Sequence, residues 1–162
     1  MRLITLILLG FTSAAAAGER TAFFGITYLD TSLQGETQGE DPAELERIEM
    51  LHNMVRERFT AEGYDLVDLA PVEADLDRIV NPAKCYGCDT RLATKLGADL
   101  SLVGEVQKVS NLIIAMNLQL RDAETGEMLR GGVVDIRGNT DDAWRRGMRY
   151  ILDNRIFQKE TR

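Results

Sequence analysis

The chain is poor in the residues that most often bind metals and cofactors. Its 162 residues include one histidine, His52, and two cysteines, Cys85 and Cys88. A structural zinc site needs about four cysteine or histidine ligands, more than this composition provides. Attachment of a c-type haem needs a histidine directly after the second cysteine, and Asp89 stands there. The sequence therefore predicts no zinc site, no haem and no other cofactor.

Common catalytic motifs are missing as well. The chain has no G-x-S-x-G motif and no glycine pattern of a nucleotide-binding loop. His52 has no serine or cysteine placed near it in the sequence to act as a nucleophile. The sequence therefore favours a protein that is not an enzyme.

The first seventeen residues have the pattern of a secretory signal peptide. Arg2 is followed by the apolar stretch Leu3–Phe11 and then by small residues that end at Ala17. The apolar stretch is shorter than the roughly 20 residues of a membrane-spanning helix. We predict cleavage after Ala17, a mature chain of residues 18–162 that forms one domain, and a periplasmic location. Because no cysteine lies near the cleavage site, no lipid anchor is expected.

The charge balance restricts the choice of partners. The formal net charge is −7, and it becomes −8 when Arg2 is removed with the signal peptide. An acidic chain is repelled by phosphate backbones, so nucleic acid is not an expected partner. No basic amphipathic stretch points to the surface of an anionic membrane. The expected partner is another protein of the cell envelope.

Hydrophobic periodicity predicts an α/β fold. Residues 23–29 and 64–69 have strand patterns, and between them Asp41 and Pro42 start a helix with Glu44 as the last residue of a capping box. One face of that helix is expected to be apolar, through Leu45, Ile48, Leu51, Val55 and Phe59. Residues 34–40 lack any apolar period and are predicted to be a surface loop.

The second half of the chain is predicted to be a meander followed by a helix. Short helices over 71–80 and 89–96 precede strands near 100–106, 112–121 and 128–136, whose short turns require antiparallel pairing. Gly131 and Gly132 indicate a bulge or an edge in the last strand. Thr140 caps a final helix with Trp144, Met148 and Ile151 on one face. The expected fold is one mixed sheet of about five strands with two long helices packed on it.

Cys85 and Cys88 are the clearest candidate site. In an exported protein two neighbouring cysteines are expected to form a disulfide. A catalytic pair is the alternative, because a helix start at Asp89 and the positive charge of Lys84 would favour a reactive thiolate. The thioredoxin arrangement, however, places its cysteine pair directly between a strand and a long helix, and a later strand there begins with proline. The three prolines of this chain all lie in its first half. A structural disulfide is therefore the favoured interpretation.

A second candidate is the loop of Asp30, Thr31 and Ser32, which follows the first predicted strand. Its oxygen-bearing side chains suit a cation or a small ligand. The same residues also form ordinary turns, because short polar side chains bind their own backbone. The turn is the favoured interpretation, and ligand or metal binding near residues 30–40 stays open.

Four stretches of the chain resemble a known family. They are residues 29–33, the cysteine pair with residues 92–99, residues 104–112 and residues 135–140. Together they resemble a family of small secreted proteobacterial proteins catalogued as a domain of unknown function. More distantly, the run from Leu96 to Gln107 is similar to the amino-terminal domain of TolB and to domains of the curli secretion channel and of lipoprotein activators of cell-wall synthases. This resemblance implies a non-catalytic α/β module that binds another envelope protein.

Overall fold

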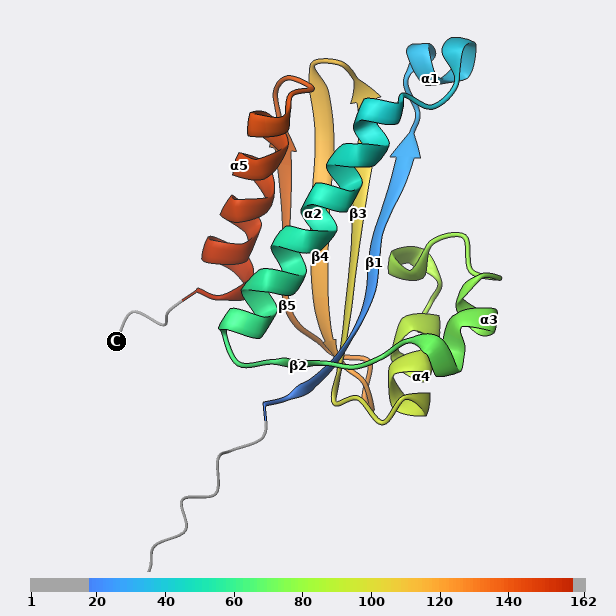
Figure 1. Ribbon diagram of the computed structural model, residues 1–162, viewed down its shortest axis with the longest axis vertical. Coiled ribbons are helices and arrows are strands. Elements are labelled where there is room, and N and C mark those ends of the chain that lie inside the picture. Colours follow the sequence, from blue (N-terminus) through green and yellow to red (C-terminus); the bar gives the residue numbers. More distant parts are fainter. Residues whose placement is uncertain (1–17, 159–162) are drawn as a thin grey trace, which may run out of the picture.

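The computed structural model describes residues 18–158, so the predicted signal peptide lies outside the described residues. A five-stranded sheet forms its centre, with the strand order β2-β1-β3-β4-β5 (Figure 1). The strands are β1 (Arg20–Asp30), β2 (Asp65–Leu66), β3 (Leu100–Ser110), β4 (Ile113–Asp122) and β5 (Met128–Ile136). β1 pairs in parallel with β2 and β3, whereas β3, β4 and β5 form an antiparallel meander. The predicted mixed α/β sheet is confirmed.

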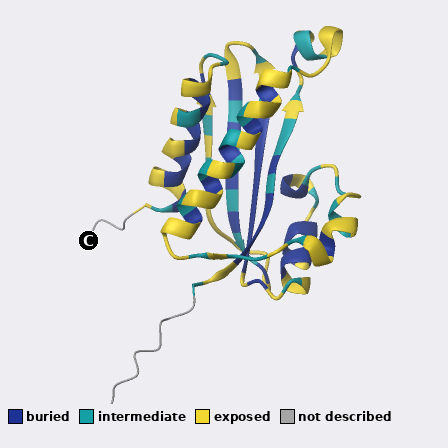
Figure 2. Cartoon of the chain, viewed as in Figure 1, coloured by how far each residue is buried: buried dark blue, intermediate teal, exposed yellow. Residues whose placement is uncertain are grey.

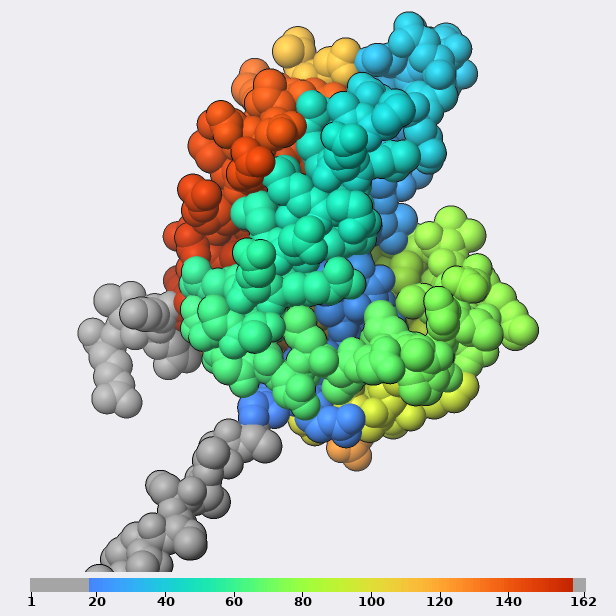
Figure 3. Space-filling model, viewed as in Figure 1, coloured from blue at the N-terminus to red at the C-terminus, as the bar shows by residue number. Residues whose placement is uncertain are grey.

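One face of the sheet is covered by two long helices, α2 (Pro42–Ala61) and α5 (Asp141–Ile151), as Figures 1 and 3 show. Side chains of the alternating residues of β3 and β4 meet the apolar sides of these helices in one core. Figure 2 shows the buried segments of the strands and of both helices. The core contains Phe23, Ile26, Ile48, Leu51, Val55, Phe59, Leu102, Val106, Ile114, Met116, Leu118, Trp144, Met148 and Ile151.

At the start of α2, one prediction from the sequence is confirmed and two are wrong. Asp41 caps α2 and accepts a hydrogen bond from the backbone N–H of Ala43, as expected. The predicted capping box is wrong, because the Glu44 side chain points into the protein and is fully buried. Leu45, predicted to be in the core, is exposed. The buried side of α2 therefore begins one residue earlier than the apolar pattern indicated.

On the other face of the sheet, the segment between β2 and β3 covers β1 and β3. This segment contains η1 (Ala70–Val72), α3 (Glu73–Leu76), η2 (Pro82–Lys84) and α4 (Cys88–Lys95). It packs Val72, Leu92 and Ala93 against Phe24 and Val103 of the sheet. The predicted helix over 89–96 is confirmed, while the segment 71–80 forms only short helical turns. Gly97, at a φ of +65°, ends α4 in the left-handed conformation that was expected.

The predicted surface loop over residues 34–40 is wrong, because α1 (Leu33–Gln38) forms there. The hydroxyl of Ser32 accepts a hydrogen bond from the backbone N–H of Gly35 at 3.1 Å and caps this helix. No residue of α1 is buried, so the helix leaves no apolar period in the sequence. A short helix with no buried residue is held by its cap and its attachment to β1, not by a packed face.

His52 supports an irregularity in β1. The register of β1 against β3 shifts between Phe23 and Ile26, where Gly25 has a φ of +86°. Nε2 of His52 accepts a hydrogen bond from the backbone N–H of Ile26 at 2.8 Å. This bond satisfies a donor that the bulge removes from the sheet.

Among residues 18–158, no helix is both long and apolar enough to cross a bilayer.

Candidate functional site

The predicted ligand loop leads from β1 into α1. Oδ1 of Asp30 accepts hydrogen bonds from the backbone N–H and the hydroxyl of Ser32, at 2.8 and 2.6 Å. Oδ2 of Asp30 lies 3.2 Å from Nζ of Lys108 on β3. The hydroxyl of Thr31 donates to the backbone carbonyl of Lys108 at 3.1 Å. The polar groups of the loop thus have internal partners, and ligand or metal binding there stays a prediction.

Asp30 is part of a larger cluster beneath the start of α2. Nζ of Lys108 lies 2.6 Å from Oε1 of Glu44, and both side chains are buried, with 1% and 0% exposed. The hydroxyl of Tyr28 donates to Oε2 of Glu44, and the side-chain amide of Asn139 donates to Oε1. We call Tyr28, Asp30, Glu44, Lys108 and Asn139 the buried ion cluster. It joins β1, β3, α2 and the loop before α5.

The buried ion cluster changes the acidity of its members. Burial alone would raise the pKa of Asp30, but hydrogen bonds from Ser32 and the charge of Lys108 bring it below its ordinary value. Burial opposes the charge of Lys108, yet Glu44 and Asp30 outweigh it and raise its pKa. Burial, and then the adjacent Glu44 carboxylate, raise the pKa of Tyr28 far above its ordinary value. The lysine and Asp30 are thus held as ions and the tyrosine as a neutral hydroxyl.

The sequence contains one signal for this cluster, a lysine at an inward position of a strand. Within β3, Leu102, Gly104, Val106 and Lys108 alternate onto the same face of the strand. A lysine at an inward position needs a buried carboxylate, because an unpaired buried charge is very costly. Which acid would supply it was not visible, since Glu44 lies in a helix start and also fits a capping box.

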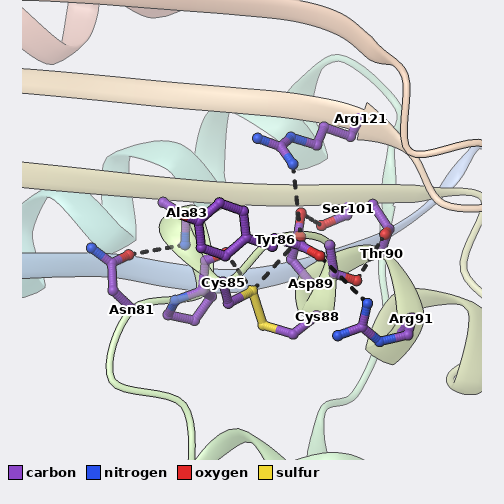
Figure 4. Close-up of a disulfide and its surroundings, with 12 residues drawn as sticks. Asn81, Ala83, Cys85, Tyr86, Cys88, Asp89, Thr90, Arg91, Ser101 and Arg121 are labelled. Atoms are coloured by element: carbon purple, nitrogen blue, oxygen red, sulfur yellow. Dashed lines mark hydrogen bonds and ion pairs between the residues drawn. A yellow bond between two sulfur atoms is a disulfide. The ribbon is translucent and has the colours of Figure 1, made fainter.

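The cysteine pair forms the predicted disulfide, and its loop lies between η2 and α4 (Figure 4). The side chain of Asn81 accepts a hydrogen bond from the backbone N–H of Ala83 and caps η2. Cys88 is the first residue of α4, and Gly87 precedes it at a φ of +87°. Two consecutive turns therefore bring the sulfur atoms together, and the bond closes a loop of four residues.

Buried polar contacts attach the disulfide loop to the sheet. The carboxylate of Asp89 accepts a hydrogen bond from the hydroxyl of Ser101 at 2.9 Å and lies 3.9 Å from Nη1 of Arg121 (Figure 4). Nζ of Lys84 lies 2.8 Å from the buried carboxylate of Glu105 on β3. The loop is thus held from both ends, and its conformation is set by the protein around it.

Tyr86 is the residue that this arrangement presents to solvent. Its side chain is 99% exposed, and its φ of +55° is the only positive value of a non-glycine residue in the described chain. A non-glycine residue in this region costs about 1 kcal/mol or more, so the surrounding structure must impose it. Beside the ring lies a hollow of about 310 Å³ lined by Ala83, Lys84, Tyr86 and Arg121. No sequence pattern indicated this exposed aromatic residue.

The surroundings of the disulfide restrict its chemistry. Oδ1 of Asp89 lies 4.0 Å from Sγ of Cys85, so a negative thiolate at Cys85 would face a carboxylate. The start of α4 favours negative charge at Cys88 instead, but Cys88 is buried. The geometry fits a structural disulfide better than a reactive one.

Among residues 18–158, no three histidine, cysteine, aspartate or glutamate side chains are placed to hold a metal ion together.

The chain is similar to bacterial proteins of known structure. The lipoprotein GNA1162 from Neisseria meningitidis is similar with a TM-score of 0.54 and 17% identity, over 88% of this chain and 99% of that one. The LpoB C-terminal domain from Salmonella enterica has a TM-score of 0.49 and 19% identity, over 76% and 85%. The PelC dodecamer protein from Paraburkholderia phytofirmans has a TM-score of 0.49 and 13% identity, over 86% and 89%. At such identities the similarity to GNA1162 establishes a shared fold.

The family is established by a match of the sequence to a family model. Residues 19–156 match the family described as "Protein of unknown function (DUF2380)". This match spans almost all of the described chain, so the protein belongs to that family, and the resemblance to a domain of unknown function is confirmed. Among curated proteins, no sequence is similar enough to count as a relative.

Proposed function

We propose that this protein is an exported, non-catalytic module that binds another protein of the cell envelope through its disulfide loop. The observation that carries the proposal is Tyr86, which is fully exposed in an imposed backbone conformation. Exposed tyrosine beside arginine is typical of the residues that dominate binding energy in protein interfaces. Arg121 borders the adjoining hollow, which has room for a side chain of the partner.

The proposed location rests on the disulfide together with the amino-terminal pattern. Residues 1–17 have the composition of a signal peptide, and cleavage after Ala17 would leave residues 18–162. A disulfide persists in the periplasm, whereas it is rare in the cytosol. A relationship to TolB-type domains, expected from the run Leu96 to Gln107, is part of the proposal and would agree with binding to an envelope protein.

The test compares Tyr86→Gly with the wild-type mature protein in capture from an envelope extract of the native host. Glycine accepts positive φ without strain, so this variant removes the ring without harming the loop. We expect a partner that the wild type captures to be lost with Tyr86→Gly. The matched control is Leu33→Ser, an exposed residue of α1 beside the other candidate loop. If Tyr86→Gly still captures the partner, the proposal is contradicted. If only Leu33→Ser loses the partner, the binding site lies at α1.

A thiol–disulfide oxidoreductase is the second candidate, favoured by the position of Cys88 at the start of α4. The two functions differ in the reduction potential of the Cys85–Cys88 pair. We expect a value below about −300 mV, as in structural disulfides, whereas oxidoreductases lie between about −120 and −270 mV.

Ligand or metal binding at residues 30–40 is tested by thermal shift with a metabolite and metal panel.

A further inference from the structure

The edge of the sheet at β5 combines an unpaired strand with uncompensated positive charge. β5 is the last strand in the order β2-β1-β3-β4-β5, so its outer backbone groups have no neighbouring strand among residues 18–158. The strand is nine residues long, and Met128, Leu129 and Val133 on it are exposed. A long exposed edge of this kind is a template for another strand, and proteins normally protect it.

Two glycines occupy the middle of this edge, so β5 has no side chains of its own there. Hollows of about 400 and 510 Å³ lie along it, and Gly131 and Arg155 line both of them. A Cβ atom at Gly132 would lie 2.5 Å from Cγ of Arg155, so the stem of that arginine lies directly on the strand. The centre of β5 thus has no side chains of its own, and the side chains of Met128 and Arg155 pack over its two glycines.

The arginines at this edge lack the carboxylate partners that several other cations of the protein have. Lys108, Arg47 and Arg58 each contact a carboxylate. In the part of the chain that the structure describes, no carboxylate lies within ion-pair distance of Arg130 or Arg155. Arg130 donates to the backbone carbonyl of Gln158 at 3.4 Å, and the Arg155 guanidinium lies 6.0 Å from the Tyr150 ring. In a chain with a net charge of −7, this is a local positive site.

We propose that β5 binds an extended acidic segment of a partner protein, which adds to the sheet as a further strand. Its backbone would pair with β5, its acidic side chains would contact Arg130 and Arg155, and its apolar side chains would cover Val133 on the other face. A second copy of this chain fits less well, because antiparallel pairing of two β5 strands around Gly132 would bring both pairs of arginines together. The overall negative charge opposes an acidic segment only weakly, since salt screens charges beyond about 8 Å.

This surface is distinct from the disulfide loop. Arg130 and Arg155 lie on the side of the sheet that carries α5, whereas the loop packs against the opposite face. Tyr86→Gly should therefore bind an acidic strand as the wild type does, and failure of either proposal leaves the other intact.

The test is an NMR titration of the mature protein with a short blocked peptide of alternating valine and glutamate. We expect shifts confined to the amide signals of residues 128–136 and to the side chains of Arg130 and Arg155. Peptides with lysine in place of glutamate, or with alternate backbone nitrogens methylated, should give none. Loss of two exposed ion pairs in Arg130→Gln/Arg155→Gln should weaken binding about fivefold.

The matched control, Arg78→Gln/Arg91→Gln, makes the same change in net charge at exposed sites of the segment between β2 and β3, and it should bind as the wild type does. The proposal is overturned if millimolar peptide causes no shifts on β5, or if the lysine peptide binds equally well. Shifts of β5 that depend on protein concentration, without peptide, would identify a second copy as the occupant and overturn it too.

Discussion

Replacement of Lys108 by methionine tests whether the buried ion cluster stabilises the fold. The ammonium group lies 2.6 Å from Glu44 and 3.2 Å from Asp30, and its side chain is almost completely buried. Methionine fills a similar volume but leaves two buried carboxylates without a cation. Removal of one partner from a buried ion pair costs about 3–5 kcal/mol. We expect Lys108→Met to lower the free energy of unfolding by that amount.

The assay is urea denaturation followed by the fluorescence of Trp144, the only tryptophan. The indole Nε1 donates to Asn139 at 2.9 Å, so the probe adjoins the cluster. The control is Lys95→Met, which breaks an exposed pair with Asp75 and should cost less than about 1 kcal/mol. If Lys108→Met lowers the free energy of unfolding no more than this control does, the cluster does not stabilise the fold. Adding Glu44→Gln to Lys108→Met should restore part of the lost stability.

The same cluster predicts a stability maximum between two pH limits. The pKa of Asp30 is lowered in the fold, so its contribution is present above about pH 3.8 and is lost as the pH falls through the folded value. The pKa of Lys108 and that of Tyr28 are raised, so their contributions are present below about pH 10 and are lost as the pH rises further. In Lys108→Met, acid should cost less stability than it costs the wild type, because without the cation the folded pKa of Asp30 is depressed less. An unchanged loss of stability in acid would argue against the pairing.

Three further substitutions test individual contacts by urea denaturation. Replacement of both Cys85 and Cys88 by serine should cost about 2 kcal/mol at most, because the bond closes a loop of only four residues; complete unfolding would mean that the disulfide is essential. His52→Leu should cost about 1–3 kcal/mol, because the backbone N–H of Ile26 loses its acceptor, and full stability would show that the bond contributes nothing. Gly97→Ala should cost about 1 kcal/mol for its positive φ, and a stabilised variant would contradict the left-handed cap.

Residues that pack by their own periodicity were predictable. Ile48, Leu51, Val55 and Phe59 recur at helical spacing and are buried as a consequence. Leu45 follows the same spacing but is exposed, because Glu44 is the residue that faces the sheet in the first turn of α2. There Glu44 meets Lys108, and a charge pair fifty or more residues apart has no periodic signal.

The candidate site could be predicted only in part. Two neighbouring cysteines in a chain with an export signal predict a disulfide from composition alone, and Cys85 and Cys88 form one. The exposure of Tyr86 could not be predicted, because its positive φ is imposed by the sulfur bond and by the contacts of Asp89 and Lys84 with the sheet. The partners of Asp89 and Lys84 in those contacts lie on later strands.

The order of the strands and of the two long helices, the caps at Asp41 and Thr140 and the antiparallel meander were determined by the sequence itself, because each depends on residues within a few positions of one another. The tertiary structure alone decided which polar groups were buried, which edge of the sheet stayed open and where positive charge was left without a partner. These properties depend on distances between segments that are remote in the chain. Local propensity and periodicity contain no information about such distances.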